Sequence, residues 1–208
     1  MNIFLSILDC LKIVIQALRF GVVNIPIENS SSLLIRTLGF FNPFFVFNRN
    51  NPHGLRIKNF LENLGPMFIK FGQLLSTRTD VVPLNITSHL KELTDQCKPF
   101  STTEAKEIIE NSLNIKIDEI FEDFEEIPLA AASLAQVHKA KLKTTNEKVV
   151  IKVLRPGIHK KVKRNVRVMR AAGFLVNFFY QDSNRLKLNN VIDDYEKTIL
   201  RELDLKVE

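Results

Sequence analysis

The chain has 208 residues, enough for one large or two small domains, and 45% of them are apolar while 25% are charged. This balance is typical of a folded protein with a buried core. The net charge of +6 would suit nucleic acid, an anionic membrane or a phosphorylated ligand, so charge alone selects no partner. Cys10 and Cys97 are far apart, and neither they nor the four histidines form a metal-binding pattern. The sequence therefore indicates no disulfide framework and no metal site.

The N-terminal stretch from Asn2 to Ile27 is apolar apart from one polar stripe. Four residues spaced by three and four form this stripe: Asp9, Lys12, Gln16 and Arg19. These charges fit poorly with a transmembrane span or a secretory signal. Two alternatives remain equally open, a helix lying in a membrane interface and a helix packed on its own protein. The run FFNPFFVF, Phe40 to Phe47, adds apolar surface that calls for a partner or a bilayer.

Helical periodicity dominates the next part of the chain. It predicts helices from about Leu55 to Leu64, from Pro66 to Thr77 and from Asn85 to Gln96. Ser101 and Glu104 then form a capping box before another helix. We therefore expect the first half of the chain to be mostly helical.

The predicted helix that begins at Pro66 contains the unusual string KFGQ. Lys70 and Gln73 fall on one face of this apolar helix, and Gly72 costs roughly 1 kcal/mol there relative to alanine. Such a glycine is usually kept for the close approach of another backbone or a ligand. Taken alone, the string also fits the solvated edge of a core helix.

The character of the chain changes near Ile115, where β-branched and alternating residues predict strands. Pro128 to Leu142 reads as a strand, a small-residue turn and a second strand, and Val149 to Leu154 as a neighbouring antiparallel strand. A long basic helix from Ile158 to Tyr180 follows, and a last helix runs from about Asn189 to the end. A solvent-exposed face is enough to explain the basic residues of this helix. No base-reading motif accompanies them, so we expect no nucleic-acid partner.

The strands have the layout of a kinase-like nucleotide site, with a small-residue loop followed by a lysine in the next strand. Lys152 sits among valines and an isoleucine, so we expect its stem to be buried and its ammonium to meet an anion. The loop has alanines, from Ala130 to Ala132, and Ser133 where glycines are usual, which alters the cradling of phosphates by backbone N–H groups. On the last helix, Asp204 and Glu208 would share one face and Glu202 would point about 120° away from Glu208. Glu208 could then pair with Lys152 and Glu202 with Lys70, while the alternative is that this acidic helix end is a solvated surface with ordinary i,i+4 pairs.

Four strings in this order closely resemble the UbiB family, the atypical protein-kinase-like proteins of ubiquinone biosynthesis. They are KFGQ, LAAASLAQVH, VVIKVLRPGI and YEKTILRELDLKVE. The resemblance implies an α+β fold, in which a helical N-terminal extension precedes a protein-kinase-like N-lobe of antiparallel sheet and helices. It divides the chain into an apolar, membrane-associated segment at 1–50, a helical extension with the KxGQ motif at 51–114, and the N-lobe at 115–208, ending in a helix of the αC type.

The resemblance also implies roles for individual residues. Lys70, Gly72 and Gln73 form the KxGQ motif, which gates the pocket together with Glu202 and Asp204 of the ExD motif. Lys152 is the nucleotide lysine and Glu208 its partner. The other nucleotide-binding positions are Ala130, Ala131, Ala132, Ser133, Leu134, Ala135 and Val137.

The kinase-like C-lobe is missing from the sequence, so we expect the chain to have no catalytic residue and no metal ligand of its own. The chain is then the N-terminal fragment of a longer protein, the product of an interrupted reading frame, or one half of a protein completed by a second chain. The implied cofactors are ATP or ADP and Mg²⁺, whose ligands belong to the C-lobe. The implied function is an ATP-binding kinase or ATPase that acts in or regulates ubiquinone biosynthesis. The alternative is a non-catalytic membrane-associated scaffold or pseudokinase lobe. Expected partners are nucleotide, membrane lipid or quinone-pathway intermediates, and other ubiquinone-synthesis proteins. The expected location is the cytoplasmic side of the bacterial inner membrane, and otherwise the cytoplasm.

Overall fold

The computed structural model describes residues 3–23, 25, 44–48, 50–80, 82–95, 97–179 and 188–205. It is α+β, as predicted, and divides into two compact units. Unit 1 comprises Met1–Thr94 and Val162–Glu208, and unit 2 comprises Asp95–Lys161. Each unit is described by itself.

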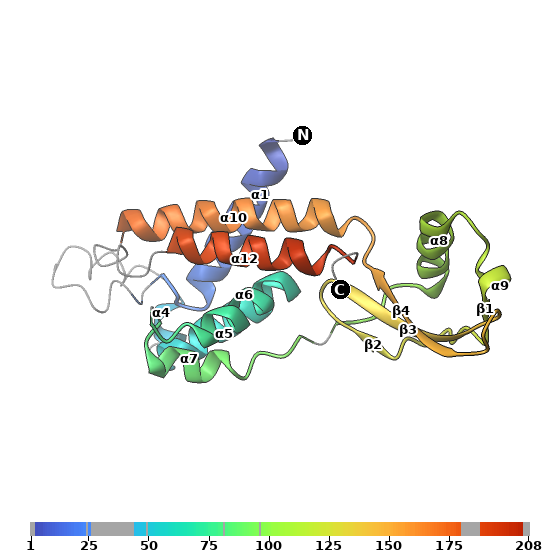
Figure 1. The fold of residues 1–208 in the computed structure, drawn as a ribbon. Coiled ribbons are helices and arrows are strands. Elements are labelled where there is room, and N and C mark those ends of the chain that lie inside the picture. The colour runs from blue at the N-terminus through green and yellow to red at the C-terminus, as the bar shows by residue number, and fades with distance from the viewer. Residues whose placement is uncertain are drawn as a thin grey trace. The chain divides into compact units, whose positions relative to one another are not determined.

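Unit 1 is helical (Figure 1). Its helices are α1 (Ile3–Arg19), α4 (Phe45–Asn48), α5 (His53–Leu64), α6 (Pro66–Thr77), α7 (Leu84–Leu90), α12 (Leu188–Glu202) and, from Val162 onward, α10 (Ile158–Phe179). Helices α5, α6 and α7 pack on one another. Gly65 joins α5 to α6 with a φ of 105°, a conformation that favours glycine, and Pro66 occupies the first turn of α6, where its missing N–H is not needed.

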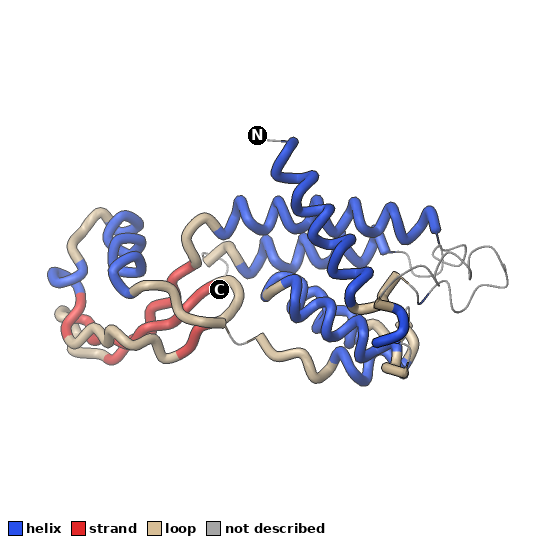
Figure 2. Tube along the Cα trace, turned by 180° about the vertical axis from the view of Figure 1, so that it is seen from behind, coloured by secondary structure: helices blue, strands red, loops and turns tan. Residues whose placement is uncertain are grey.

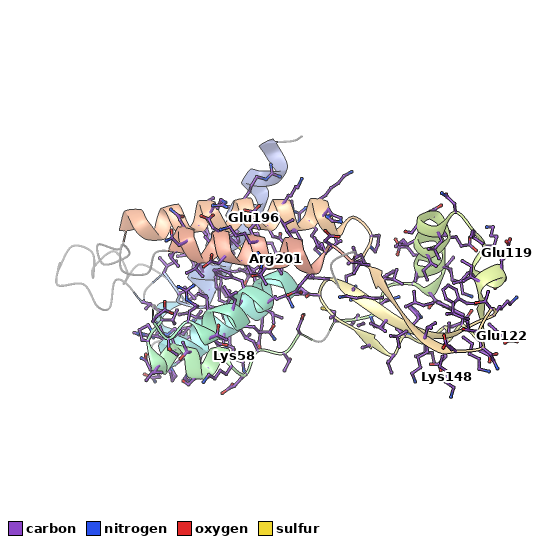
Figure 3. The ribbon with its side chains drawn as sticks, viewed as in Figure 1. Lys58, Glu119, Glu122, Lys148, Glu196 and Arg201 are labelled. Carbon is purple, nitrogen blue, oxygen red and sulfur yellow. The ribbon has the colours of Figure 1, made fainter. Side chains whose placement is uncertain are left out.

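Helices α10 and α12 run side by side in both views of the chain (Figures 1 and 2). Each presents an apolar stripe with helical spacing. On α12 the buried residues are Val191, Ile192, Tyr195 and Ile199, and on α10 they include Val162, Val166 and Met169. Arg170 of α10 also reaches two carboxylates of α12, Asp193 at 2.6 Å and Glu196 at 2.7 Å. Glu196 and Arg201 mark α12 in Figure 3.

Helix α1 packs against unit 1 on one side, where Ile13 is buried. On the opposite side, the apolar residues Leu11, Val14 and Ile15 are exposed. Of the run FFNPFFVF, the residues before Phe44 lie outside the described residues, while Phe44 and Phe47 are exposed. None of the described helices combines the length and the apolar character needed to cross a bilayer.

Unit 2 contains a small antiparallel sheet and the helices α8 (Thr102–Leu113) and α9 (Ile117–Ile120). The strands are β1 (Phe121–Glu122), β2 (Ala130–Ala131), β3 (Ala135–Leu142) and β4 (Lys148–Leu154). Strand β3 pairs with β4 on one side and with both short strands, β1 and β2, on the other. Glu122 and Lys148 lie at the same end of the sheet (Figure 3).

The two faces of this sheet differ because strand side chains alternate. One face is covered by α8, where Ala105, Ile109 and Val153 form a core together with Ile117. Gln136 and His138 lie on this face and are fully buried. Their polar atoms are paired. Gln136 bonds His138 Nε2 at 2.9 Å and both backbone groups of Phe100, while His138 Nδ1 bonds the carbonyl of Glu125 at 2.9 Å. The neutral imidazole therefore carries its proton on Nδ1.

The structure corrects several of the predicted boundaries. Helix α7 ends at Leu90 rather than near Gln96, and the segment after Ile115 begins with the short helix α9 rather than with a strand. The Glu110 carboxylate accepts the N–H of Ile117 at 3.1 Å and the Lys116 ammonium at 2.9 Å, which starts α9 and lowers the pKa of Glu110. The two compact units are divided after Thr94 and after Lys161, and α8 packs on the sheet of unit 2. The three predicted domain ranges stay predictions.

Candidate functional site

The residues predicted to bind nucleotide line up across the open face of the sheet in unit 2. Val137 lies opposite Ala130 on β2 and opposite Lys152 on β4. Directly opposed residues of antiparallel strands place their side chains on the same face. Ala130, Val137 and Lys152 therefore form one row across three strands, on the face that α8 does not cover.

The prediction that the Lys152 stem is buried is wrong, because Lys152 is exposed. The valines and the isoleucine around it belong in part to the other face: Ile151 and Val153 pack toward α8, while Val150 is 65% exposed beside Lys152. An apolar strand sequence does not by itself say which face is covered. The predicted partner, Glu208, lies outside the described residues, so that pairing stays a prediction.

The turn between β2 and β3 is held by side chains and not by glycine. Ser133 is buried, and its hydroxyl donates to Asp95 Oδ2 at 2.9 Å. Arg155 donates from Nε to the Ala132 carbonyl and from its backbone N–H to the Leu134 carbonyl. The described non-glycine residues with positive φ are Asn114, Asp123 and Asn146, so Ala130 to Ala135 keep ordinary backbone angles. Of the remaining predicted positions, Leu134 and Ala135 are buried and Ala131 is half-buried.

The residues of the KxGQ motif lie on α6 in unit 1. Lys70 Nζ lies 3.0 Å from Glu202 Oε2 on α12, so the ion pair expected from the sequence is formed. Gln73 points elsewhere, since its amide donates to the Leu93 carbonyl at 3.0 Å. A Cβ on Gly72 would lie 2.4 Å from Leu93 Cδ1 and 2.7 Å from Leu61 Cδ1. Gly72 is thus needed for close packing, and the gating role of the motif stays a prediction.

The last helix is shorter than predicted. Helix α12 ends at Glu202, and Asp204 is an exposed residue beyond it, whose N–H bonds the Arg201 carbonyl at 3.0 Å. This bond spans three residues and belongs to a tight last turn. The prediction that Asp204 lies on a helical face is therefore wrong.

Sequence reasoning missed two residues that hold these parts in place. The Tyr195 hydroxyl donates to the Met67 carbonyl at 2.7 Å, and its ring meets Phe71 edge-on with centroids 5.3 Å apart. Tyr195 precedes Glu202 by seven residues, a spacing that places both on one helical face and could have revealed it. Arg155 fixes the alanine turn, and nothing in the sequence distinguishes it from any arginine at a strand end.

The Lys70–Glu202 pair offers a first test. The two side chains are 25% and 36% exposed, so we expect a modest coupling of about 0.5–1 kcal/mol in the free energy of unfolding. The measurement is a double-mutant cycle with Lys70→Met and Glu202→Gln. Strict additivity of the two single changes would mean that the pair contributes nothing.

Comparison with known proteins shows which family the chain resembles. The ABC1 atypical kinase-like domain matches residues 92–208. Three relatives are each named "Probable protein kinase UbiB". The protein of Shewanella baltica strain OS155 is 43% identical over 167 residues, covering 79% of this chain and 30% of the relative. The protein of Aeromonas hydrophila is 47% identical over 155 residues, covering 74% of this chain and 28% of the relative. The protein of Vibrio vulnificus strain YJ016 is 46% identical over 157 residues, covering 76% of this chain and 29% of the relative.

The antiparallel sheet with its covering helix and its lysine-bearing strand is consistent with the N-lobe of a protein-kinase-like fold. The chain belongs to the ABC1 atypical kinase-like family, in agreement with the UbiB resemblance of its sequence motifs. It spans about three tenths of the length of these curated relatives.

Proposed function

We propose that this chain supplies the nucleotide-binding N-lobe of an ATP-dependent kinase-like protein that acts in or regulates ubiquinone biosynthesis. The observation that carries the proposal is the row of Ala130, Val137 and Lys152 on the open face of the sheet. It offers small and apolar side chains for a base and an ammonium for phosphates. The names of the relatives support a kinase-like role, and the quinone pathway comes from the family resemblance.

Each nucleotide-contacting residue has a defined part in this proposal. The Lys152 ammonium pairs with the α- and β-phosphates, and Glu208 orients it. Val137 and the exposed Val150 give an apolar platform for the base. The turn at Ala132 and Ser133 is rigid because Arg155 and Asp95 bond it, so it presents a fixed surface rather than a flexible glycine loop.

Mg²⁺ accompanies the nucleotide in this proposal. Among the described residues no group of three or more histidine, cysteine, aspartate or glutamate side chains is arranged to hold a metal ion. In this proposal the Mg²⁺ ligands belong to a C-lobe outside this sequence.

The test is thermal unfolding of the full chain with and without magnesium ATP or ADP. At about 100 times the dissociation constant, a ligand stabilises by about 2.7 kcal/mol, or about 5–10 °C for a chain of this size. We expect Lys152→Ala to lose more than about half of this shift. Lys148→Ala is the matched control, because Lys148 is an exposed lysine four residues earlier on the same strand face. An equal shift in the wild type and Lys152→Ala would remove Lys152 from the site.

The second candidate function is a non-catalytic membrane-associated scaffold or pseudokinase lobe. The observation that favours it is the exposed apolar side of α1. In both cases the proposed partners are membrane lipid, quinone-pathway intermediates or other ubiquinone-synthesis proteins, and the proposed location is the cytoplasmic side of the bacterial inner membrane.

A further inference from the structure

The alanine turn of unit 2 joins β2, which ends at Ala131, to β3, which begins at Ala135, and Ser133 is its middle residue. Turns that bind phosphate usually point their N–H groups at the anion. Two donors of this turn are instead used within unit 2. The Ala132 N–H bonds the Ala135 carbonyl at 2.9 Å, and the Ser133 hydroxyl donates to Asp95 Oδ2 at 2.9 Å. The turn therefore keeps these two protons from a ligand.

The bond between Ser133 and Asp95 decides what the hydroxyl can do. A serine hydroxyl has one proton to donate, and an ionised carboxylate can only accept. A hydrogen bond to a carboxylate is also stronger than one between neutral groups. Ser133 is 5% exposed, so its hydroxyl has little access to water. While Asp95 holds this proton, Ser133 has none to donate to a phosphate.

Asp95 also places a negative charge beside the turn. Its Oδ1 lies 4.0 Å from Cys97 Sγ, and the Cys97 N–H bonds the Ala131 carbonyl at 3.2 Å, so the segment after Asp95 lies against β2. Burial raises the pKa of the Cys97 thiol, and the charge of Asp95 raises it further. The charges of Arg155 and Lys161 lower the same pKa. Cations therefore lie near this segment as well, and Asp95 reduces the attraction that they exert on an anion.

We propose that Asp95 is a specificity-determining residue, which weakens the binding of nucleotides more strongly the more phosphates they carry. It does so in two ways, by holding the Ser133 hydroxyl and by repelling the phosphates. This inference rests on the proposed function, in which the turn lies over the phosphates of the nucleotide. The side chain bonded to the middle of the turn then disfavours the charge that a phosphate-binding loop would attract.

The experiment is calorimetric titration of the full chain, as wild type and as Asp95→Asn, with magnesium ATP, magnesium ADP and AMP. Asparagine keeps the shape of aspartate, and its amide can still bond the Ser133 hydroxyl, so the variant is expected to fold. Thermal unfolding without nucleotide checks this. We expect Asp95→Asn to bind ATP about three- to tenfold more tightly, and AMP less than about twofold more tightly, because the Coulomb energy grows with the charge of the ligand.

The matched control is Asp118→Asn, which removes the same charge from an exposed aspartate on α9. Helix α9 adjoins β1, at the other end of the sheet from β2 (Figure 1). Since β3 has eight residues, this control lies on the order of 20 Å from the turn, beyond the screening length of about 8 Å. Asp118→Asn should therefore bind ATP like the wild type.

Ser133→Ala separates the two effects of Asp95. In this background the gain in ATP affinity from Asp95→Asn is expected to shrink, because only the repulsion of the phosphates remains to be relieved. An undiminished gain would overturn the role of the hydroxyl.

The outcomes separate this inference from the proposed function. If the wild type and Asp95→Asn both bind no nucleotide, the proposed function is overturned and the role of Asp95 with it. If the wild type, Asp95→Asn and Asp118→Asn bind ATP equally tightly, nucleotide binding stands and the role of Asp95 is overturned. An equal gain for ATP and AMP also overturns this role, because a merely structural change in the turn would not depend on the number of phosphates.

Discussion

Replacing Tyr195 with alanine is expected to lower the free energy of unfolding by about 3–5 kcal/mol, the usual cost of removing a buried aromatic side chain. Tyr195 is a residue of α12 that is 1% exposed and contacts α6. The substitution removes the edge-on contact with Phe71 and the bond to the Met67 carbonyl, and it leaves a cavity where the two helices meet. Urea denaturation followed by circular dichroism measures the loss.

Two further variants separate the contributions of this side chain. Tyr195→Phe keeps the ring and removes the hydroxyl, so we expect a loss of about 1 kcal/mol, since the Met67 carbonyl forgoes one hydrogen bond. Leu200→Ala on the same helix is the control, because Leu200 is 41% exposed and its truncation should cost less than about 0.5 kcal/mol. A loss for Tyr195→Ala no larger than that for Leu200→Ala would mean that Tyr195 does not hold α12 on α6.

Tyr195 also matters for the candidate site. The Lys70–Glu202 pair joins the same two helices, α6 and α12, and Tyr195 in the middle of α12 bonds the first turn of α6. An ion pair between partly exposed groups is too weak to position two helices by itself. The buried tyrosine therefore sets the distance that the ion pair bridges.

Local patterns in the sequence were sufficient for much of the fold. Helix α6 has the predicted bounds because Pro66 fits its first turn and the apolar period ends at Thr77. The N-cap of α8 is confirmed, since Ser101 Oγ accepts the N–H of Glu104 at 3.1 Å. The antiparallel pairing of β3 and β4 is also confirmed. The interactions that start α6 and α8 lie within a few residues of one another, and β3 and β4 are consecutive strands joined by a short turn.

Other failures have the opposite character, because they depend on contacts distant in sequence. The exposure of Lys152 follows from which face α8 covers. Helix α7 ends at Leu90, and the Leu93 carbonyl beyond it accepts the amide of Gln73, 20 residues earlier. The turn at Ser133 needs Asp95, 38 residues earlier. Spacing along the chain carries no signal for such contacts.

The sequence shows that Gly72 is unusual in the middle of a helix, and the packing around it explains why glycine is needed there. A methyl group there would lie 2.4 Å from Leu93 Cδ1 and 2.7 Å from Leu61 Cδ1, and both leucines are buried. Overpacking of this kind costs up to about 3 kcal/mol, against a gain of about 1 kcal/mol from the higher helix propensity of alanine. We therefore expect Gly72→Ala to lower the free energy of unfolding by up to about 2 kcal/mol.

The matched control is Gly173→Ala on α10, another mid-helix glycine. The nearest atom to its Cβ would be Ile192 Cδ1 at 3.4 Å, an ordinary contact. This variant should therefore be neutral or gain up to about 1 kcal/mol in urea denaturation. The steric cause predicts in addition that Leu93→Ala costs less in the Gly72→Ala background than in the wild type, because the smaller side chain relieves the closest contact. Additive effects of Gly72→Ala and Leu93→Ala would contradict this steric cause. Equal losses of stability for Gly72→Ala and Gly173→Ala would show that α6 does not need its glycine for packing.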